Sequence, residues 1–171
     1  MVLYRFKPVE SWTRMQEATI SGHAYMIGHR FESVDAGDSA EILFEVPENT
    51  NRDIYIIDIS IATLSECYLD IFIDSTVVSS GTKLTPFNLN TNYESDTTVN
   101  IEYGGTYSDG QLIYSSVIPG GFRVNALGYV VTAGAGIILN GGKKLHIKIT
   151  NISTTASTDV SVNLLWIEES G

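Results

Sequence analysis

Histidine is the residue type in this chain best suited to metal binding or to a charge change near neutral pH. His23 and His29 lie six positions apart on one expected strand, so their side chains share a face, as a metal pair or a pH switch would need. His146 falls on the polar face of a late strand. All three positions also suit ordinary surface or interface histidines. We favour that interpretation and predict no metal site.

Nucleophilic catalysis needs a serine or cysteine exposed on a glycine-flanked turn, with a histidine base and a carboxylate close by. The sequence contains no such turn. Its single cysteine, Cys67, can form neither an intrachain disulfide nor a two-cysteine metal site, so we expect a small buried apolar residue. Candidate carboxylates for glycoside hydrolysis, Asp70, Asp74 and Glu102, lie where a solvated outer face explains them. We predict a chain that is not an enzyme and needs no cofactor.

The segment from Thr85 to Thr98 is the longest run of mostly uncharged polar residues, and we expect a long surface loop. Its oxygen-bearing and aromatic side chains belong to Asn88, Asn90, Asn92, Tyr93, Glu94 and Asp96. Their alternation is similar to that of a calcium loop, but Tyr93 stands where such a loop requires glycine and Val99 where it requires glutamate. Asparagine-rich turn chemistry explains the segment better. A binding loop remains a hypothesis.

Tyrosines gather in the same part of the chain, and carbohydrate-binding modules stack sugars on such side chains. The candidates are Tyr93, Tyr103, Tyr107 and Tyr114. Because tyrosine is also enriched at protein interfaces, this pattern does not separate a glycan site from a protein contact.

The elements that must position these residues are short strands. Runs of β-branched and aromatic residues recur about every ten residues between turn clusters of Gly, Asn, Asp, Ser and Pro. The pattern predicts strands over residues 22–34, 40–46, 54–63, 67–74, 97–103, 111–118, 122–132, 136–140, 144–150 and 159–168. It is typical of an all-β fold, either a sandwich or a barrel. We predict a single antiparallel β-sandwich over residues 21–171.

Alternation within the strands predicts which side chains are buried. The inner rows are Cys67, Leu69, Ile71 and Ile73; Leu145, Ile147 and Ile149; and Val160, Val162, Leu164 and Trp166. The alternation changes phase at Ile56 and Ile57, so we expect either a β-bulge there or a strand covered on both faces.

The formal net charge of −10 argues against binding to nucleic acid or to an anionic membrane, because both need a basic surface. No stretch is long and apolar enough to span a bilayer or to form a signal peptide, so we expect a soluble, unprocessed protein. Residues 1–30 carry four basic against two acidic residues, whereas residues 31–171 carry six basic against eighteen acidic.

Residues 1–20 match neither a strand nor a strong helix pattern, and Pro8 interrupts them. We expect an extended N-terminal arm. Its large apolar groups would be unfavourable on a free tail, so they should dock on this domain or on a neighbouring subunit. The residues expected to make that interface are Tyr4, Arg5, Phe6, Lys7, Trp12 and Arg14.

Several motifs occur in an order that resembles a known family. They are Gly81 to Leu84, the asparagine run 88–92, Gly105-Thr106 with Asp109-Gly110, Ile118 to Gly121, Ile149 to Ser153 and Leu164 to Glu168. Over residues 22–168 the chain resembles small tailed-bacteriophage virion proteins of β-sandwich type, found among capsid decoration proteins. The family carries an arginine in the asparagine run, and this chain has none between Arg52 and Arg123.

The resemblance implies a jelly-roll-like sandwich that forms a homotrimer, sits on the capsid exterior and clamps neighbouring shell subunits. The partners would be the major capsid protein and further copies of the chain, in a virion protein made in the host cytoplasm. Two alternatives remain open: a carbohydrate- or receptor-binding domain of a phage fibre or tail, and a β-sandwich hydrolase.

Overall fold

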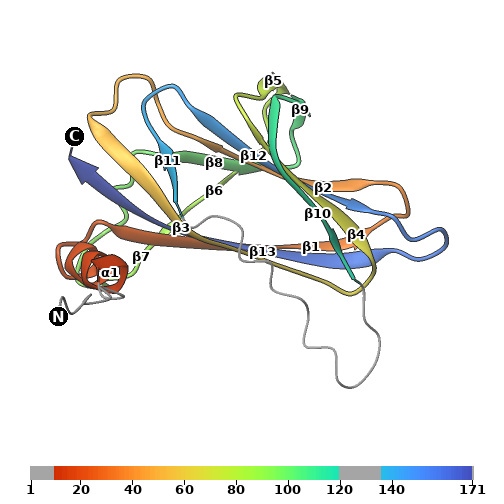
Figure 1. The fold of residues 1–171 in the computed structure, drawn as a ribbon, viewed down its shortest axis with the longest axis horizontal. Helices are drawn as coiled ribbons and strands as arrows, with labels where there is room; N and C mark the ends of the chain where they lie inside the picture. Colours follow the sequence, from red (N-terminus) through yellow and green to blue (C-terminus); the bar gives the residue numbers. More distant parts are fainter. Residues whose placement is uncertain (1–9, 120–135, 171) are drawn as a thin grey trace, which may run out of the picture.

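Two antiparallel sheets packed face to face carry most of the regular structure of the computed structural model, which describes residues 10–119 and 136–170 (Figure 1). The elements are α1 (Glu10–Ile20), β1 (Ala24–Val34), β2 (Ser39–Glu45), β3 (Arg52–Thr63), β4 (Cys67–Ile73), β5 (Thr76–Ser79), β6 (Thr82–Leu84), β7 (Phe87–Asn88), β8 (Asn100–Tyr103), β9 (Thr106–Ser108), β10 (Gln111–Ile118), β11 (Ile137–Leu139), β12 (Lys144–Asn151) and β13 (Thr158–Ser170). The predicted all-β sandwich is confirmed. The strand expected over residues 122–132 lies outside the described residues.

The strand order is nested. The first sheet has the order β11-β3-β13-β1-β7 and the second has the order β10-β4-β12-β2-β8-β6. The first four strands pair with later strands in reverse order along the chain. β1 pairs with β13, β2 with β12, β3 with β11, and β4 with β10. The connection between β4 and β10 adds three short strands to the sheet edges and forms the separate β5-β9 ribbon (Figure 1).

The core lies between the two sheets, and its members follow the predicted alternation. The inner rows expected on β4, β12 and β13 are fully buried apart from Ile73, which is partly buried. Trp166 is the largest side chain among them, and it stacks on Tyr25 at 5.8 Å and meets Phe44 edge-on at 5.2 Å. Cys67 is buried as predicted, and burial raises the pKa of its thiol.

The phase change in β3 corresponds to a β-bulge. Leu165 of β13 pairs with Asp58 and Trp166 pairs with Ile56, which leaves Ile57 as the extra residue. Ile56 consequently faces the core while Ile57 faces outward, where α1 covers it. Both alternatives offered by the sequence pattern are present together.

The prediction that residues 1–20 form an extended arm is wrong for residues 10–20, which form α1. Met15 and Ala18 lie three positions apart, so they share one helix face and pack it on the first sheet. The helix ends where Gly22 adopts a φ of +77° and the His23 amide donates to the Ala18 carbonyl at 2.8 Å. The predicted interface residues Tyr4, Arg5, Phe6 and Lys7 lie outside the described residues.

Candidate functional site

Helix α1 covers the end of the first sheet through a small apolar cluster. Ala18 is buried against Ala24 and Ile167, with partly buried Met15 and Tyr55 beside them. Trp12, which we expected at an interface, lies in this helix. The cluster is separate from the main core, so α1 is attached by a small contact that can open independently of the sandwich.

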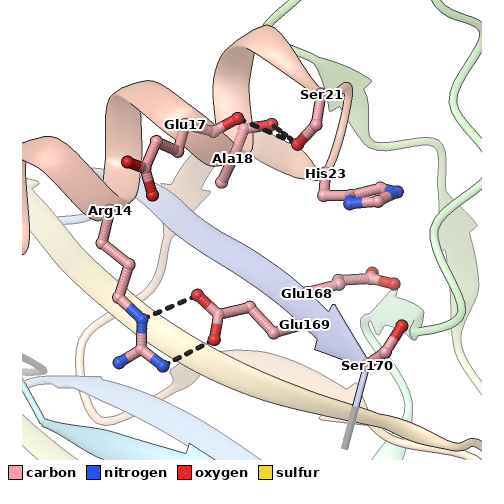
Figure 2. Close-up of a pocket in the computed structure, with 8 residues that line it drawn as sticks. All are labelled: Arg14, Glu17, Ala18, Ser21, His23, Glu168, Glu169 and Ser170. Carbon is pink, nitrogen blue, oxygen red and sulfur yellow. Dashed lines mark hydrogen bonds and ion pairs between the residues drawn. The ribbon is translucent and has the colours of Figure 1, made fainter.

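Arg14 fastens α1 to the last strand. Its Nε donates to Glu169 Oε1 at 2.7 Å and its Nη2 donates to Glu169 Oε2 at 2.5 Å, a bidentate ion pair (Figure 2). The guanidinium carbon also lies 4.3 Å from the centre of the Tyr55 ring. The hydrogen bonds to Glu169 raise the pKa of Arg14. Its charge, expected at an intermolecular interface, is thus engaged within the chain.

Two hollows flank Arg14. One, of about 320 Å³, is lined by Arg14, Glu17, Ala18, Ser21, His23, Glu168, Glu169 and Ser170 (Figure 2). The other, of about 280 Å³, is a mainly apolar groove lined by Arg14, Tyr55, Ile56, Ile57, Gly136, Ile137 and Ile167. In Figure 2 the carboxylates of Glu17 and Glu169 and the ring of His23 point in different directions. The first hollow therefore has no pair of groups aimed at one substrate atom.

Replacing Arg14 with alanine should loosen α1 while leaving the sandwich intact. The pair is partly exposed, so its loss should cost up to about 1 kcal/mol and raise the rate of amide exchange in α1 about fivefold. Hydrogen-exchange mass spectrometry measures this directly. An R30A variant is the matched control, because Arg30 pairs with exposed Glu32, away from α1, and its loss should leave α1 unchanged. Equal exchange in both variants would contradict the assigned role.

Glu168 accepts more hydrogen bonds than any other carboxylate in the described chain. Its side chain is fully buried and pairs with Arg52 Nη1 at 3.0 Å. It accepts hydrogen bonds from the Trp166 indole at 3.2 Å, from the hydroxyl of Thr97, and from the amide and hydroxyl of Thr98. These bonds tie the end of the 85–98 segment to β13. Glu168 is two positions beyond Trp166, so strand alternation places it on the same inward face as Val160 to Trp166. This is the sequence signal that predicts an inward carboxylate.

The predicted binding loop, residues 88–96, folds back on the chain. Asn88 is buried and donates to the carbonyls of Gly22 at 2.8 Å and Glu94 at 3.3 Å. Asn90 donates to the carbonyl of Ile20 at 3.1 Å and accepts from the Asn92 amide at 3.1 Å. The asparagines thus close successive turns and hold the end of α1.

The remaining loop residues are placed as follows. Asp96 accepts a hydrogen bond of 2.5 Å from the hydroxyl of Tyr25, and burial together with this bond raises the pKa of Tyr25. Tyr93 is half exposed, with its ring against Gly22. A Cβ added at Gly22 would lie 2.7 Å from that ring, so the close approach requires glycine. The 88–96 segment is built as a strap, with Tyr93 as its main exposed group.

His23 precedes β1 and lines the hollow beside α1, while His29 lies within β1 on the inner side of the sheet. The His29 ring is 3.9 Å from the centre of the Tyr103 ring and 4.6 Å from that of Phe31. Burial lowers the pKa of His29 below its usual value. Within residues 10–119 and 136–170, no group of three or more histidine, cysteine or acidic side chains is arranged to hold a metal ion.

The lowered pKa of His29 predicts a loss of stability in mild acid. Below the unfolded-state pKa of about 6.5 the unfolded chain takes up a proton that the folded chain resists, so stability falls with decreasing pH. An H29F variant should therefore lose less stability than the wild type between about pH 7 and 5. Urea unfolding at several pH values measures the difference. Parallel curves for the two proteins would rule out this assignment.

His146 is fully buried within the chain, so the prediction of an ordinary surface or interface histidine is wrong for this residue. Its side chain does point away from the main core, but Tyr107 of the β5-β9 ribbon packs edge-on against its ring at 5.1 Å and Phe72 stacks on the ring at 5.5 Å. Nδ1 lies 3.1 Å from Ser75 Oγ and Nε2 lies 3.1 Å from Glu41 Oε2. The covering ribbon is distant in sequence, so strand alternation alone could not reveal the burial.

Ser75, His146 and Glu41 follow the order of a nucleophilic triad. Ser75 is buried, and its Oγ also accepts a hydrogen bond from the Gly110 amide at 3.2 Å. Ser75 and His146 are both buried, so with Glu41 they form a buried hydrogen-bond network. Glu102, expected on a solvated face, has a buried Oε1 that has no hydrogen-bond partner among the described residues.

The most extensive exposed apolar surface of a strand lies on β10, at the edge of the second sheet (Figure 1). Its exposed large side chains are those of Leu112, Ile113, Tyr114 and Val117, and Tyr68 of β4 is exposed opposite Val117. An exposed apolar edge strand is a common site of protein association.

Comparison with known proteins assigns no family. No protein-family model matches the chain, and no curated protein matches it either. No helix in the described parts of the chain is long and apolar enough to cross a membrane. The candidate functional site is therefore identified from the structure alone. It is the exposed apolar edge of the second sheet at β10.

Proposed function

We propose that this chain is a structural protein of a tailed-bacteriophage virion, a decoration subunit that binds the capsid exterior and stabilises it through contacts between subunits. The observation that supports this most is the nested pairing of β1 to β4 with β13, β12, β11 and β10. We interpret that order as a jelly roll, an architecture frequent in viral capsid proteins and in lectins.

The surface supports a binding role without catalysis. The best candidate for a catalytic constellation, around Ser75 and His146, is buried, whereas large apolar side chains are exposed on β10. The net charge of −10 favours a basic patch on a protein shell over nucleic acid as the partner. The partners would be the major capsid protein and further copies of this chain, on the outer surface of the virion.

Co-sedimentation with empty shells tests the proposal. The shells are made from the major capsid protein of the phage that encodes the chain, and purified chain is added at increasing concentration. We expect saturable binding and a higher melting temperature of the decorated shells. Lack of binding to intact shells would overturn the proposal.

A glycan array run with the same preparation examines the lectin alternative. Glycan binding without shell binding would identify a receptor-binding domain. The amides of Asn88 and Asn90 are committed to bonds within the chain, so a sugar would have to use Tyr93 and other exposed groups.

A further inference from the structure

The four sheet edges of the sandwich are unequal. Three of them end in strands of two or three residues: β7 and β11 in the first sheet, and β6 in the second. Short edge strands are one of the usual devices that prevent sheets from pairing edge to edge, and a lysine is another, which β6 carries as Lys83. The fourth edge is β10, with eight residues.

β10 lacks the charges that normally protect a long edge. Its sequence, QLIYSSVI, contains no charged residue and no proline. A β-bulge between Leu112 and Tyr114 interrupts its first part, so the regular edge runs from Tyr114 to Ile118. No strand of the described chain pairs with the free side of this run. The free backbone groups and the exposed Tyr114 and Val117 are what a further β-strand requires.

We propose that β10 pairs antiparallel with β10 of a second copy of this chain, which joins the two second sheets into one continuous sheet across a twofold axis. The inference rests on the assembly role proposed above and names its surface. A second copy is the occupant that the edge favours, because an antiparallel strand is complementary to its own copy across a twofold axis and this run carries no charge. Two chains of net charge −10 repel each other over most of their surfaces, and an uncharged edge strand lets them approach without placing like charges opposite each other.

The alternation of the sheet restricts the register of this pairing. Directly opposed residues of an antiparallel pair lie on the same face, so one residue of the strand must oppose its own copy. Ser116 pairs with buried Leu69 and faces inward, and its Oγ is buried with no hydrogen-bond partner among the described residues. Placing the axis at Ser116 would give each hydroxyl the other as its partner.

Size-exclusion chromatography with light scattering tests the pairing on the full chain. The wild type should have twice the 18.7 kDa chain mass. A V117K variant, which places a lysine at a position that is 51% exposed, should weaken dimerisation by about tenfold or more. The matched control is V78K on β5, where the valine is 69% exposed, and it should remain dimeric. Circular dichroism confirms that both variants are folded.

Cysteine cross-linking tests the register. Directly opposed residues have Cα atoms about 4.5–5.5 Å apart, within the range of about 4.4–6.8 Å that a disulfide spans. An S116C variant should form a covalent dimer under mild oxidation, whereas V78C should not. Cys67 is paired with Ile118 on the inner face that Ser116 shares, so both variants are made in a C67A background to prevent an intrachain disulfide.

Several outcomes would overturn the inference. A wild-type monomer would show that the β10 edge is not used between copies, or that another part of the chain occupies it. A trimer, the assembly expected from the family resemblance, would exclude a twofold contact as the basis of assembly. Equal behaviour of V117K and V78K would place the interface elsewhere. Shell binding is scored separately, so a monomer that binds shells would overturn the pairing but not the decoration role.

Discussion

Replacing Glu168 with alanine is expected to lower the free energy of unfolding by about 3–5 kcal/mol, because it leaves a partly buried guanidinium without its counter-charge. The variant also removes the acceptor for the Trp166 indole and for Thr98. The charge of Arg52 would then be unpaired, in a site that is largely shielded from water. Urea denaturation monitored by tryptophan fluorescence measures the change.

The neighbouring glutamate provides the control. Glu169 forms a partly exposed ion pair with Arg14, so E169A should cost less than about 1 kcal/mol. E168Q keeps an acceptor oxygen while it removes the charge, and its stability should lie between those of E168A and the wild type. If E168A and E169A have equal stability, the buried network does not hold the 85–98 segment in the way described.

Replacing Trp166 with alanine should also cost about 3–5 kcal/mol, because it removes the largest fully buried side chain from the core. The cavity would lie between Tyr25 and Phe44, which come from opposite sheets and which the indole now joins. Thermal unfolding followed by circular dichroism measures the loss.

An exposed aromatic serves as the matched control for this variant. Tyr93 is half exposed on the 88–96 strap, and Y93A should leave the melting temperature close to that of the wild type. Since typical domains are stable by about 5–15 kcal/mol, W166A should lose a large share of the total. A melting temperature equal to that of Y93A would mean that the sheets are held together elsewhere.

Strand alternation was the most informative signal in the sequence. The rows on β4, β12 and β13 repeat every second residue over long strands, so a single buried face accounts for them. The bulge at Ile57 was also visible in the sequence, because an extra residue exchanges the inward and outward positions of all the residues that follow it in the strand. Both signals are local, and they do not depend on which strands become neighbours.

Features that depend on distant parts of the chain could not be predicted in this way. The strands β5, β6, β7 and β9 have two to four residues each, too few for a pattern to emerge. One of them, β9, brings Tyr107 against His146 and Glu102 on a face that alternation marks as polar. Helix α1 was missed because its apolar face is narrow and its stability comes from docking on Ile167 and Ala24.

The nested strand order has a consequence for synthesis on the ribosome. β13 lies between β3 and β1, and β12 lies between β4 and β2, so residues 144–170 supply an interior strand of each sheet. β1, β2 and β3 of each nascent chain must therefore wait, unpaired with their main partners, until residues 144–170 have left the exit tunnel. Such non-local pairing folds slowly, in milliseconds to seconds for all-β domains. During that interval the apolar strands are exposed, and we expect chaperones to bind them.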